Sequence, residues 1–204
     1  VGSVRRIEGT NQAYIESILD AVDRTTIQDA ELSVVVDTGN GAGGLTAPYL
    51  FRQLGCEVRS LNVQPDGSFP GRNPEPVKAE LGDLMRAVGT STADLGIAHD
   101  GDADRVIFVD ETGAYVDGNT ALAALANAVV ESGDRVVTTC NASQRLTETV
   151  EAANGTVDYV PIGNAHVLSR VRELHQQGHS VPIAGEDNGG IIYPTHRLGR
   201  DGGY

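Results

Sequence analysis

The sequence predicts an α/β protein made of two similar three-layer domains, each a mostly parallel mixed sheet covered by helices on both faces. Short apolar runs alternate with segments of helical periodicity along most of the chain. The order strand, helix, strand, helix, strand occurs twice, and each time it ends in an acidic, glycine-containing loop followed by a return strand. A length of 204 residues is also sufficient for two hydrophobic cores.

The first half of the chain supplies the first unit. A buried strand is expected at residues 32–36, and a glycine loop then leads into a helix that begins at Leu45 and stops at Gly55. The remaining elements are a strand at 58–63, a helix with Val77, Leu81, Leu84 and Val88 on one face, and strands at 95–98 and 106–109.

The second half repeats this plan after a connecting helix with Leu122, Leu125 and Val129 on one face. Strands are expected at 135–139, 157–160, 181–184 and 191–193, and helices at 144–153 and around Val167, Val171 and Leu174. We place the first domain at residues 1–113 and the second at 114–204, and expect the second to stop short of its last helix. Both acidic loops follow strand ends where α/β proteins bind ligands.

Composition narrows the class of protein. A net charge of -13 and a pI near 4.6 give a field that repels phosphate backbones, so nucleic acid is not an expected partner. Lys78 is the only lysine, and the acidic residues are spread over the chain, which is typical of a protein from a halophilic archaeon. No apolar run approaches the roughly 20 residues of a membrane helix, so we expect a cytoplasmic protein without a membrane partner. Cys56 and Cys140 are expected to be free, buried thiols.

The stretch "DGDADR" places Asp100, Asp102 and Asp104 on alternate positions between two apolar runs. Three carboxylates that lie so near to one another repel strongly unless a cation lies among them. Oxygen ligands alone fit Mg²⁺, Ca²⁺ or Mn²⁺, and Mg²⁺ is the simplest choice. The alternative is a solvated acidic turn in an acidic protein.

Three other interpretations compete for these motifs. An EF-hand requires glycine where this chain has Arg105. A phosphatase that uses "DGD" as nucleophile and acid needs a downstream lysine, and none follows Lys78, although an arginine can substitute. "GNGAGG", residues 39–44, matches the dinucleotide-binding pattern, but Asp66 lies in a turn where an acidic strand end is required. These glycines are therefore expected to shape a turn.

Four motifs taken in order resemble the central domains of the alpha-D-phosphohexomutases, the family of phosphomannomutase, phosphoglucomutase and phosphoglucosamine mutase. They are "DTGNGAGG", "PDGSFPGRNPEP", "DGDADR" and "GEDNGGIIYPTHRLGRDGG". The resemblance implies four domains around a cleft, of which this chain holds the second, with a metal loop, and the third, with a sugar-recognition loop. The expected partners are a hexose phosphate and the missing N- and C-terminal domains.

The resemblance also implies roles for individual residues. Asp100, Asp102 and Asp104 would bind Mg²⁺ against a phosphoserine supplied by the first domain. Arg105 would hold the phosphoryl group, or alternatively form a salt bridge back to an aspartate. Glu186 would accept hydrogen bonds from two sugar hydroxyls, unless it simply faces water. The phosphoryl group would move between C1 and C6 of mannose or glucose phosphate through a hexose 1,6-bisphosphate, which also serves as activator.

The chain departs from the family pattern at several positions. Asn188 and Gly190 stand where many members have serine and histidine, and Gly163 and Asn164 replace a glycine-histidine pair. Sugar contacts are still expected from Glu186, Asn188, Gly163, Asn164 and Arg200. The general acid or base is left open between His166, Arg145, a residue outside the chain and water.

No serine lies in the "SHNP" context of the family phosphoserine, so the fragment alone is predicted to be inactive. Two other functions stay open from the sequence. One is a stand-alone protein that binds metal or sugar phosphate, and the other is a phosphatase that uses Asp100 as its nucleophile.

Overall fold

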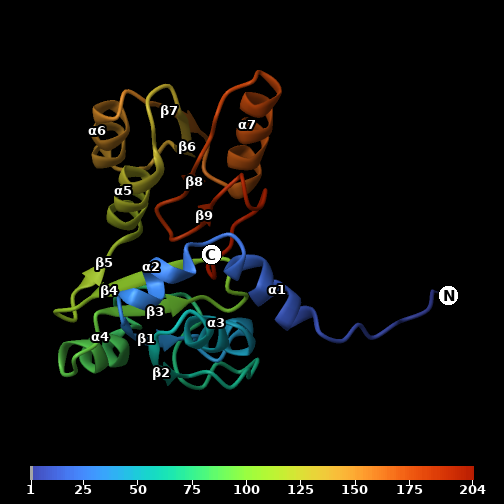
Figure 1. The fold of residues 1–204 in the computed structure, drawn as a ribbon, viewed down its shortest axis with the longest axis vertical. Helices are drawn as coiled ribbons and strands as arrows, with labels where there is room; N and C mark the ends of the chain where they lie inside the picture. Colours follow the sequence, from blue (N-terminus) through green and yellow to red (C-terminus); the bar gives the residue numbers. More distant parts are fainter. Residues whose placement is uncertain (1) are drawn as a thin grey trace.

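The computed structural model describes residues 2–204 and contains two α/β domains stacked along the long axis of the molecule (Figure 1). The sheet of the first domain has the strand order β2-β1-β3-β4-β5. β1 is parallel to β2 and β3, and β4 and β5 are added antiparallel. The strands are β1 Ser33–Asp37, β2 Glu57–Leu61, β3 Leu95–His99, β4 Val106–Asp110 and β5 Tyr115–Val116.

Helices cover both faces of this first sheet. The valines of β1 alternate between the faces: Val34 and Val36 pack with the helices α1 and α3, whereas Val35 packs with α4. This alternation produces a three-layer domain. The helices are α1 Thr10–Leu19, α2 Arg24–Asp29, the short 3₁₀ helix η1 Ala42–Leu45, α3 Ala47–Gln53 and α4 Gly82–Gly89.

The second sheet has the order β7-β6-β8-β9. β6 is parallel to β7 and β8, and β9 returns antiparallel to β8. The strands are β6 Arg135–Thr139, β7 Thr156–Val160, β8 Ala184–Gly185 and β9 Ile191–Ile192. α5 Gly118–Val129 and α6 Gln144–Ala152 cover one face, and α7 Asn164–Gln176 covers the other.

The two domains share one topology, which confirms the predicted fold class. The order β2-β1-β3-β4 in the first domain corresponds to β7-β6-β8-β9 in the second. The domain boundary at residue 113 stays a prediction, and β5 lies just beyond it while pairing with β4 of the first sheet. The acidic loops therefore occupy equivalent places, one between β3 and β4 and the other between β8 and β9.

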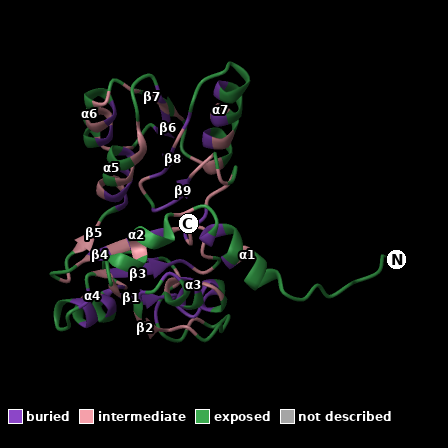
Figure 2. Ribbon diagram, in the orientation of Figure 1, coloured by how far each residue is buried: buried purple, intermediate pink, exposed green. Residues whose placement is uncertain are grey.

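A hydrophobic core continues from one domain into the other. Ile97 and Val106 of the first sheet belong to the same buried cluster as Leu122 of α5 and Ile191 of β9. Figure 2 shows buried residues on the strands of both domains, while the outer helix faces are exposed. Because this cluster crosses the interface, the two acidic loops are held in a fixed relation.

Some elements differ from the sequence-based expectations. The predicted helix through Val77 begins only at Gly82, with Leu81 as its N-cap residue, and Val77 lies outside the helix and is exposed. The sequence did not predict α1, α2 or β5.

Both cysteines are free, as expected. Cys56 is buried, but Cys140 is exposed, so the expectation that both thiols are buried was wrong for Cys140. Among the residues that the structure describes, no helix has the length and apolar character needed to cross a bilayer.

Candidate metal and sugar-phosphate site

The aspartate loop, residues 100–105, connects β3 to the antiparallel strand β4. Its three carboxylates come together: one oxygen from each of Asp100, Asp102 and Asp104 lies within 4.8 Å of the others. Asp100 is buried and Asp102 is exposed, so the cluster opens towards solvent on one side. The structure thus brings together all three residues that the sequence predicted as ligands.

The electrostatics of the cluster fit a hard cation. Burial raises the pKa of Asp104, and the neighbouring Asp100 and Asp102 raise it further, against an opposing effect of Arg200. Crowded carboxylate oxygens of this kind are the donors that Mg²⁺ prefers, and a site with three protein oxygens leaves positions for water and a phosphate oxygen. The donor set therefore fits the ion that the resemblance implies.

The glycine loop, residues 39–44, supports the aspartate loop through its backbone. Ala42 N donates to Gly101 O at 3.0 Å. A Cβ on Gly41 would lie 2.6 Å from that carbonyl oxygen, so any larger residue would push the two loops apart. The dinucleotide-like pattern is explained by this close approach and by the turn that it allows.

Arg105 forms ion pairs with carboxylates on both of its sides. Nε donates to Asp100 Oδ2 at 2.7 Å, and the two terminal nitrogens bind both oxygens of Glu75. Burial opposes its charge, but the hydrogen bonds that Arg105 donates to Glu75 and Asp100 outweigh burial and raise its pKa, so the side chain stays cationic. The salt bridge to an aspartate is thus observed, and the phosphoryl-binding role stays a prediction.

Two side chains of the proline-rich loop, residues 64–76, were not singled out from the sequence. Arg72 is buried, and its Nε donates to Asp37 Oδ2 at 3.0 Å while NH2 donates to His99 O at 2.6 Å. Arg72 thereby ties the ends of β1 and β3 together beneath the aspartate loop. Glu75 positions Arg105 from the same loop. The motif "PDGSFPGRNPEP" contains both Arg72 and Glu75 and could have drawn attention to them. The partners of the two side chains cannot be inferred from it.

The glutamate loop, residues 186–190, connects β8 to β9 in the second domain. Glu186 is only 4% exposed, which excludes the alternative of a carboxylate facing water. Its Oε1 accepts from Gly163 N at 3.2 Å, so the start of α7 holds the carboxylate in place. Asn164 follows Gly163 at the start of α7, and its Oδ1 is buried without a hydrogen-bond partner among the described residues. Asn188 is exposed and its Oδ1 accepts from Gly190 N at 3.0 Å.

Arg200 joins the two loops. One terminal nitrogen pairs with Asp104 Oδ2 of the aspartate loop, and the other donates to Glu186 Oε2 at 3.3 Å. Arg200 and two of the aspartates, Asp102 and Asp104, also line a hollow of about 280 Å³ that α1 and the glycine loop close on the other side. Asp104, Arg200 and Glu186 therefore lie in contact where the two domains meet, whereas the hollow itself is lined by none of Glu186, Gly163, Asn164 and Asn188.

His99 precedes the aspartate loop but belongs to the core. Its Nε2 lies 2.7 Å from Gly202 O, and because a carbonyl can only accept, Nε2 carries the proton. Burial lowers the pKa of His99, which keeps the ring neutral. Among the described residues, the metal cluster contains only the three aspartates. Of the acid or base candidates, His166 and Arg145 are both exposed, and Arg145 donates to Thr120 Oγ1 at 2.8 Å.

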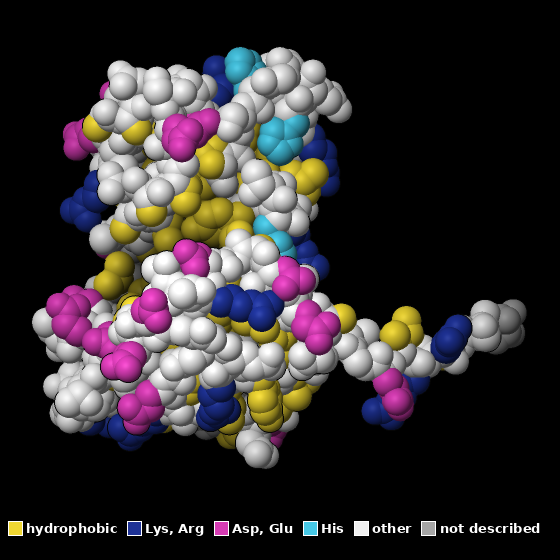
Figure 3. Space-filling view, in the orientation of Figure 1, with side chains coloured by type: hydrophobic (Ala, Val, Ile, Leu, Met, Phe, Trp, Pro, Cys, Tyr) yellow, Lys and Arg dark blue, Asp and Glu magenta, His cyan; other side chains and the backbone are white. Residues whose placement is uncertain are grey.

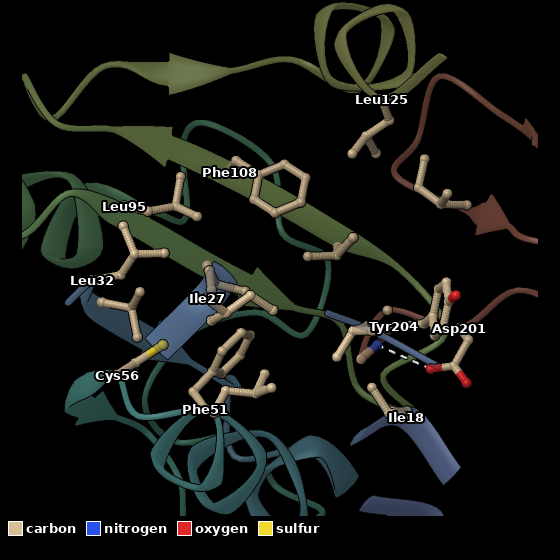
Figure 4. Close-up of a pocket in the computed structure, with 18 of the residues that line it drawn as sticks. Ile18, Ile27, Leu32, Phe51, Cys56, Leu95, Phe108, Leu125, Asp201 and Tyr204 are labelled. Atoms are coloured by element: carbon tan, nitrogen blue, oxygen red, sulfur yellow. Dashed lines mark hydrogen bonds between the residues drawn. The ribbon is translucent and has the colours of Figure 1, made fainter. Parts of the chain in front are cut away.

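A separate cavity of about 230 Å³ between the domains is apolar. Figure 4 shows side chains from both domains around it, among them Ile27, Phe51, Phe108 and Leu125. In Figure 3 hydrophobic side chains are visible in the recess between the domains. Burial raises the pKa of the Cys56 thiol in its lining, so this group is protonated at neutral pH. Its lining contains none of the predicted site residues, and its one charged side chain is the carboxylate of Asp201, so it offers no cation for a phosphate.

The comparison with family models covers both domains. Residues 12–113 match the phosphoglucomutase/phosphomannomutase alpha/beta/alpha domain II, and residues 117–204 match alpha/beta/alpha domain III. The two matches cover both domains of the repeated α/β fold, in chain order. The chain belongs to the phosphoglucomutase/phosphomannomutase family, of which it contains these two domains.

Individual proteins agree with this assignment. The chain is 43% identical over 204 residues to "Phosphoglucomutase/phosphomannomutase" of Thermococcus kodakarensis, covering 99% of this chain and 43% of the relative. It is 39% identical over 203 residues to "Probable phosphoglucosamine mutase" of Methanopyrus kandleri, covering 98% of this chain and 43% of that relative. The chain thus spans less than half of the length of either relative.

A solved structure supports the fold. The crystal structure of a phosphoglucomutase/phosphomannomutase family protein from Burkholderia thailandensis superimposes with a TM-score of 0.85 at 28% identity. The match covers 94% of this chain and 41% of the other. The arrangement of the two domains is therefore one that an experimental structure of the family contains.

Proposed function

We propose that this chain is the central part of a Mg²⁺-dependent phosphohexomutase that moves a phosphoryl group between C1 and C6 of a hexose phosphate. The observation that carries the proposal is that Arg200 touches both the carboxylate cluster and the buried Glu186. A cation site and a hydroxyl-binding carboxylate thus lie within the reach of one arginine side chain. A sugar phosphate bound between them would meet both.

The chain's residues would act mainly by positioning and by charge. Asp100, Asp102 and Asp104 would hold Mg²⁺, which when bound draws negative charge from the phosphoryl group that is transferred. Phosphoryl transfer needs little covalent help beyond such positioning and charge stabilisation. The phosphoserine that exchanges its phosphoryl group with the sugar would come from another domain, with hexose 1,6-bisphosphate as the intermediate.

Arg105 would supply the guanidinium for the phosphoryl oxygens. Its two terminal nitrogens are paired with Glu75, whose side chain is 47% exposed, whereas Nε is held by the buried Asp100. A phosphoryl group can displace the exposed partner more easily than the buried one, because an exposed ion pair contributes little free energy. The two terminal nitrogens of Arg105 would then bind two phosphoryl oxygens, while Nε keeps its hydrogen bond to Asp100.

The second domain would recognise the sugar. The Glu186 carboxylate is fixed by Gly163 N and Arg200, so it can accept hydrogen bonds from adjacent hydroxyls with little loss of conformational entropy. Asn164, which follows Gly163, has a buried Oδ1 without a hydrogen-bond partner within residues 2–204, and the exposed Asn188 can both donate and accept. We propose mannose or glucose phosphate as the substrate, and the names of the relatives add glucosamine phosphate to the sugars that need testing.

The test is phosphorus NMR on the full-length protein that contains this chain. The sample contains Mg²⁺, molar KCl and a trace of hexose 1,6-bisphosphate, and mannose, glucose and glucosamine 1-phosphates are offered separately. We expect conversion of one or more of them to the 6-phosphate. The isolated 204-residue chain is expected to give no turnover. Release of free phosphate would support the phosphatase instead, and no change at all would favour a binding protein.

Asp102→Asn provides the matched test of the cluster. None of the hydrogen bonds recorded among residues 2–204 uses the exposed Asp102 carboxylate, so the variant should fold normally. We expect a loss of turnover on the order of 100-fold, because one charged ligand of the cation is gone. Asp83→Asn is the control, since Asp83 is an exposed aspartate on α4 paired with Arg86. Equal rates for the two variants would contradict the proposed metal site.

A further inference from the structure

Arg200 lies between two carboxylates from different domains. Its NH2 pairs with Asp104 Oδ2, and its NH1 donates to Glu186 Oε2 at 3.3 Å. The Arg200 side chain is only 20% exposed and that of Glu186 only 5%. Nε of Arg200 is buried and has no hydrogen-bond partner among the described residues. The guanidinium is therefore held by its two carboxylate contacts alone.

The chain leaves an open path for this side chain at Gly190. A Cβ on Gly190 would lie 2.5 Å from Arg200 Cδ and 3.3 Å from Arg200 NH1. The side chain thus passes directly over the Gly190 backbone, and any larger residue would displace it. The position of Arg200 therefore depends on a glycine at residue 190.

The backbone next to Arg200 is fixed to the aspartate loop. Gly202 N donates to Ala103 O at 3.1 Å, and His99 Nε2 lies 2.7 Å from Gly202 O. A Cβ on Gly202 would lie 2.7 Å from Arg105 O, so the two segments touch directly. The contact of Arg200 with Asp104 therefore belongs to a packed interface between two anchored segments.

A guanidinium in this place competes with a cation. The Asp104 oxygen that Arg200 engages is less available as a ligand, and the positive charge of Arg200 repels a divalent cation at the same cluster. We propose that Arg200 is a positioning residue that competes with the divalent cation for Asp104, an inference that rests on the proposed metal site. When the cation displaces it, Arg200 remains on Glu186, so that occupancy of the metal site is coupled to the glutamate loop.

The experiment measures Mn²⁺ affinity of the full-length protein that contains this chain by electron paramagnetic resonance, which counts free Mn²⁺ directly. Arg200→Met removes the charge and is expected to tighten Mn²⁺ binding by at least about fivefold. Arg200→Lys keeps the charge but loses the fork, so its affinity should lie between those of the wild type and Arg200→Met. Arg197→Met is the matched control, because Arg197 lines the same hollow but pairs with Asp201, and we expect a change below about twofold.

Gly190→Ala tests the same inference without changing any charge. The added methyl group should push Arg200 off Asp104 and tighten Mn²⁺ binding in the same direction as Arg200→Met. In the double variant Gly190→Ala, Arg200→Met, the Mn²⁺ affinity should equal that of Arg200→Met, because the Arg200 side chain is already absent. An additional tightening in the double variant would show that Gly190 acts by another route.

The outcomes distinguish the inference from the proposed metal site. Unchanged or weaker Mn²⁺ binding in Arg200→Met, together with loss of binding in Asp102→Asn, would overturn the inference and leave the metal site intact. Undetectable Mn²⁺ binding in the wild type, or binding that Asp102→Asn does not weaken, would overturn both.

Discussion

Asp158 on β7 shows how a single carboxylate joins three elements. Its Oδ2 accepts from Arg135 Nε of β6 at 2.6 Å, and its Oδ1 accepts from Arg170 NH2 of α7 at 2.7 Å. The Asp158 side chain is 9% exposed. Burial raises its pKa, but the hydrogen bonds from the two arginines outweigh burial, so the pKa is lowered from its ordinary value of 3.8. Asp158 is therefore ionised at neutral pH and binds α7 to its sheet.

Asp158→Asn should lower the free energy of unfolding by about 1–3 kcal/mol at pH 7, because two partly buried ion pairs are lost. A lowered pKa in the folded state means that this stabilisation is present above pH 3.8 and disappears as the pH falls through the folded value. The difference between wild type and variant, measured by urea unfolding, should thus shrink towards pH 3. A difference that stays constant from pH 7 to pH 3 would contradict this assignment.

Asp20→Asn is the control for that prediction. Asp20 pairs with Arg24 on the surface, and its side chain is 80% exposed. Exposed pairs of this kind contribute roughly 0–1 kcal/mol, so the control should unfold almost like the wild type at both pH values.

At the residue scale, the sequence located the charged centre of the site and named Arg200 as a site residue, but it did not show which partners Arg200 and Arg72 have. Asp100, Asp102 and Asp104 lie within one short stretch, so their proximity follows from local spacing. Arg200 pairs with Asp104 across 96 positions of sequence, and Arg72 pairs with Asp37 across 35. Such partners depend on how the sheets and loops pack, and no local pattern encodes them.

At the scale of elements, two helices that begin with glycine show opposite constraints. A Cβ on Gly118, the first residue of α5, would lie 2.1 Å from Asp187 O in the glutamate loop. A Cβ on Gly82, the first residue of α4, would meet nothing within 4 Å. The start of α5 therefore touches the backbone of the glutamate loop, whereas the start of α4 is free of such contact.

Gly118→Ala should destabilise the protein by about 1–3 kcal/mol, because the methyl group forces the helix and the loop apart. Gly82→Ala should be neutral or stabilise by up to about 1 kcal/mol, since alanine favours helix and meets no neighbour. Thermal unfolding of the two variants provides the comparison. Equal stability of the two would contradict the described packing of α5 on the glutamate loop.

Periodicity predicted most strands and helices, and its failures have physical causes. β1, β3, β4 and β6 were expected close to their observed positions, because buried strands are short apolar runs. α1 was missed because only Ile15, Ile18 and Leu19 of it are buried. Packing of α1 against the rest of the first domain stabilises this helix more than its own sequence pattern does.

At the scale of the whole molecule, the acidic charge is the property that most needs a test. With a net charge of -13, repulsion between like charges destabilises the compact folded state, and salt screens that repulsion. If the protein is adapted to high salt, its unfolding temperature should rise markedly from low to molar KCl, as circular dichroism would show. Equal stability in both conditions would contradict the halophilic origin that the composition predicts.

The sequence alone determined the repeated α/β plan and the aspartate loop, because these depend on residues that are close together in the chain, and its resemblance to the family singled out Glu186. The tertiary structure decided which side chains serve those loops. Only the packing of the two domains brings Arg200 over Gly190 to both Asp104 and Glu186. The physical reason is that local patterns depend on backbone geometry, whereas ion pairs between domains depend on how two separately formed sheets bury a common core.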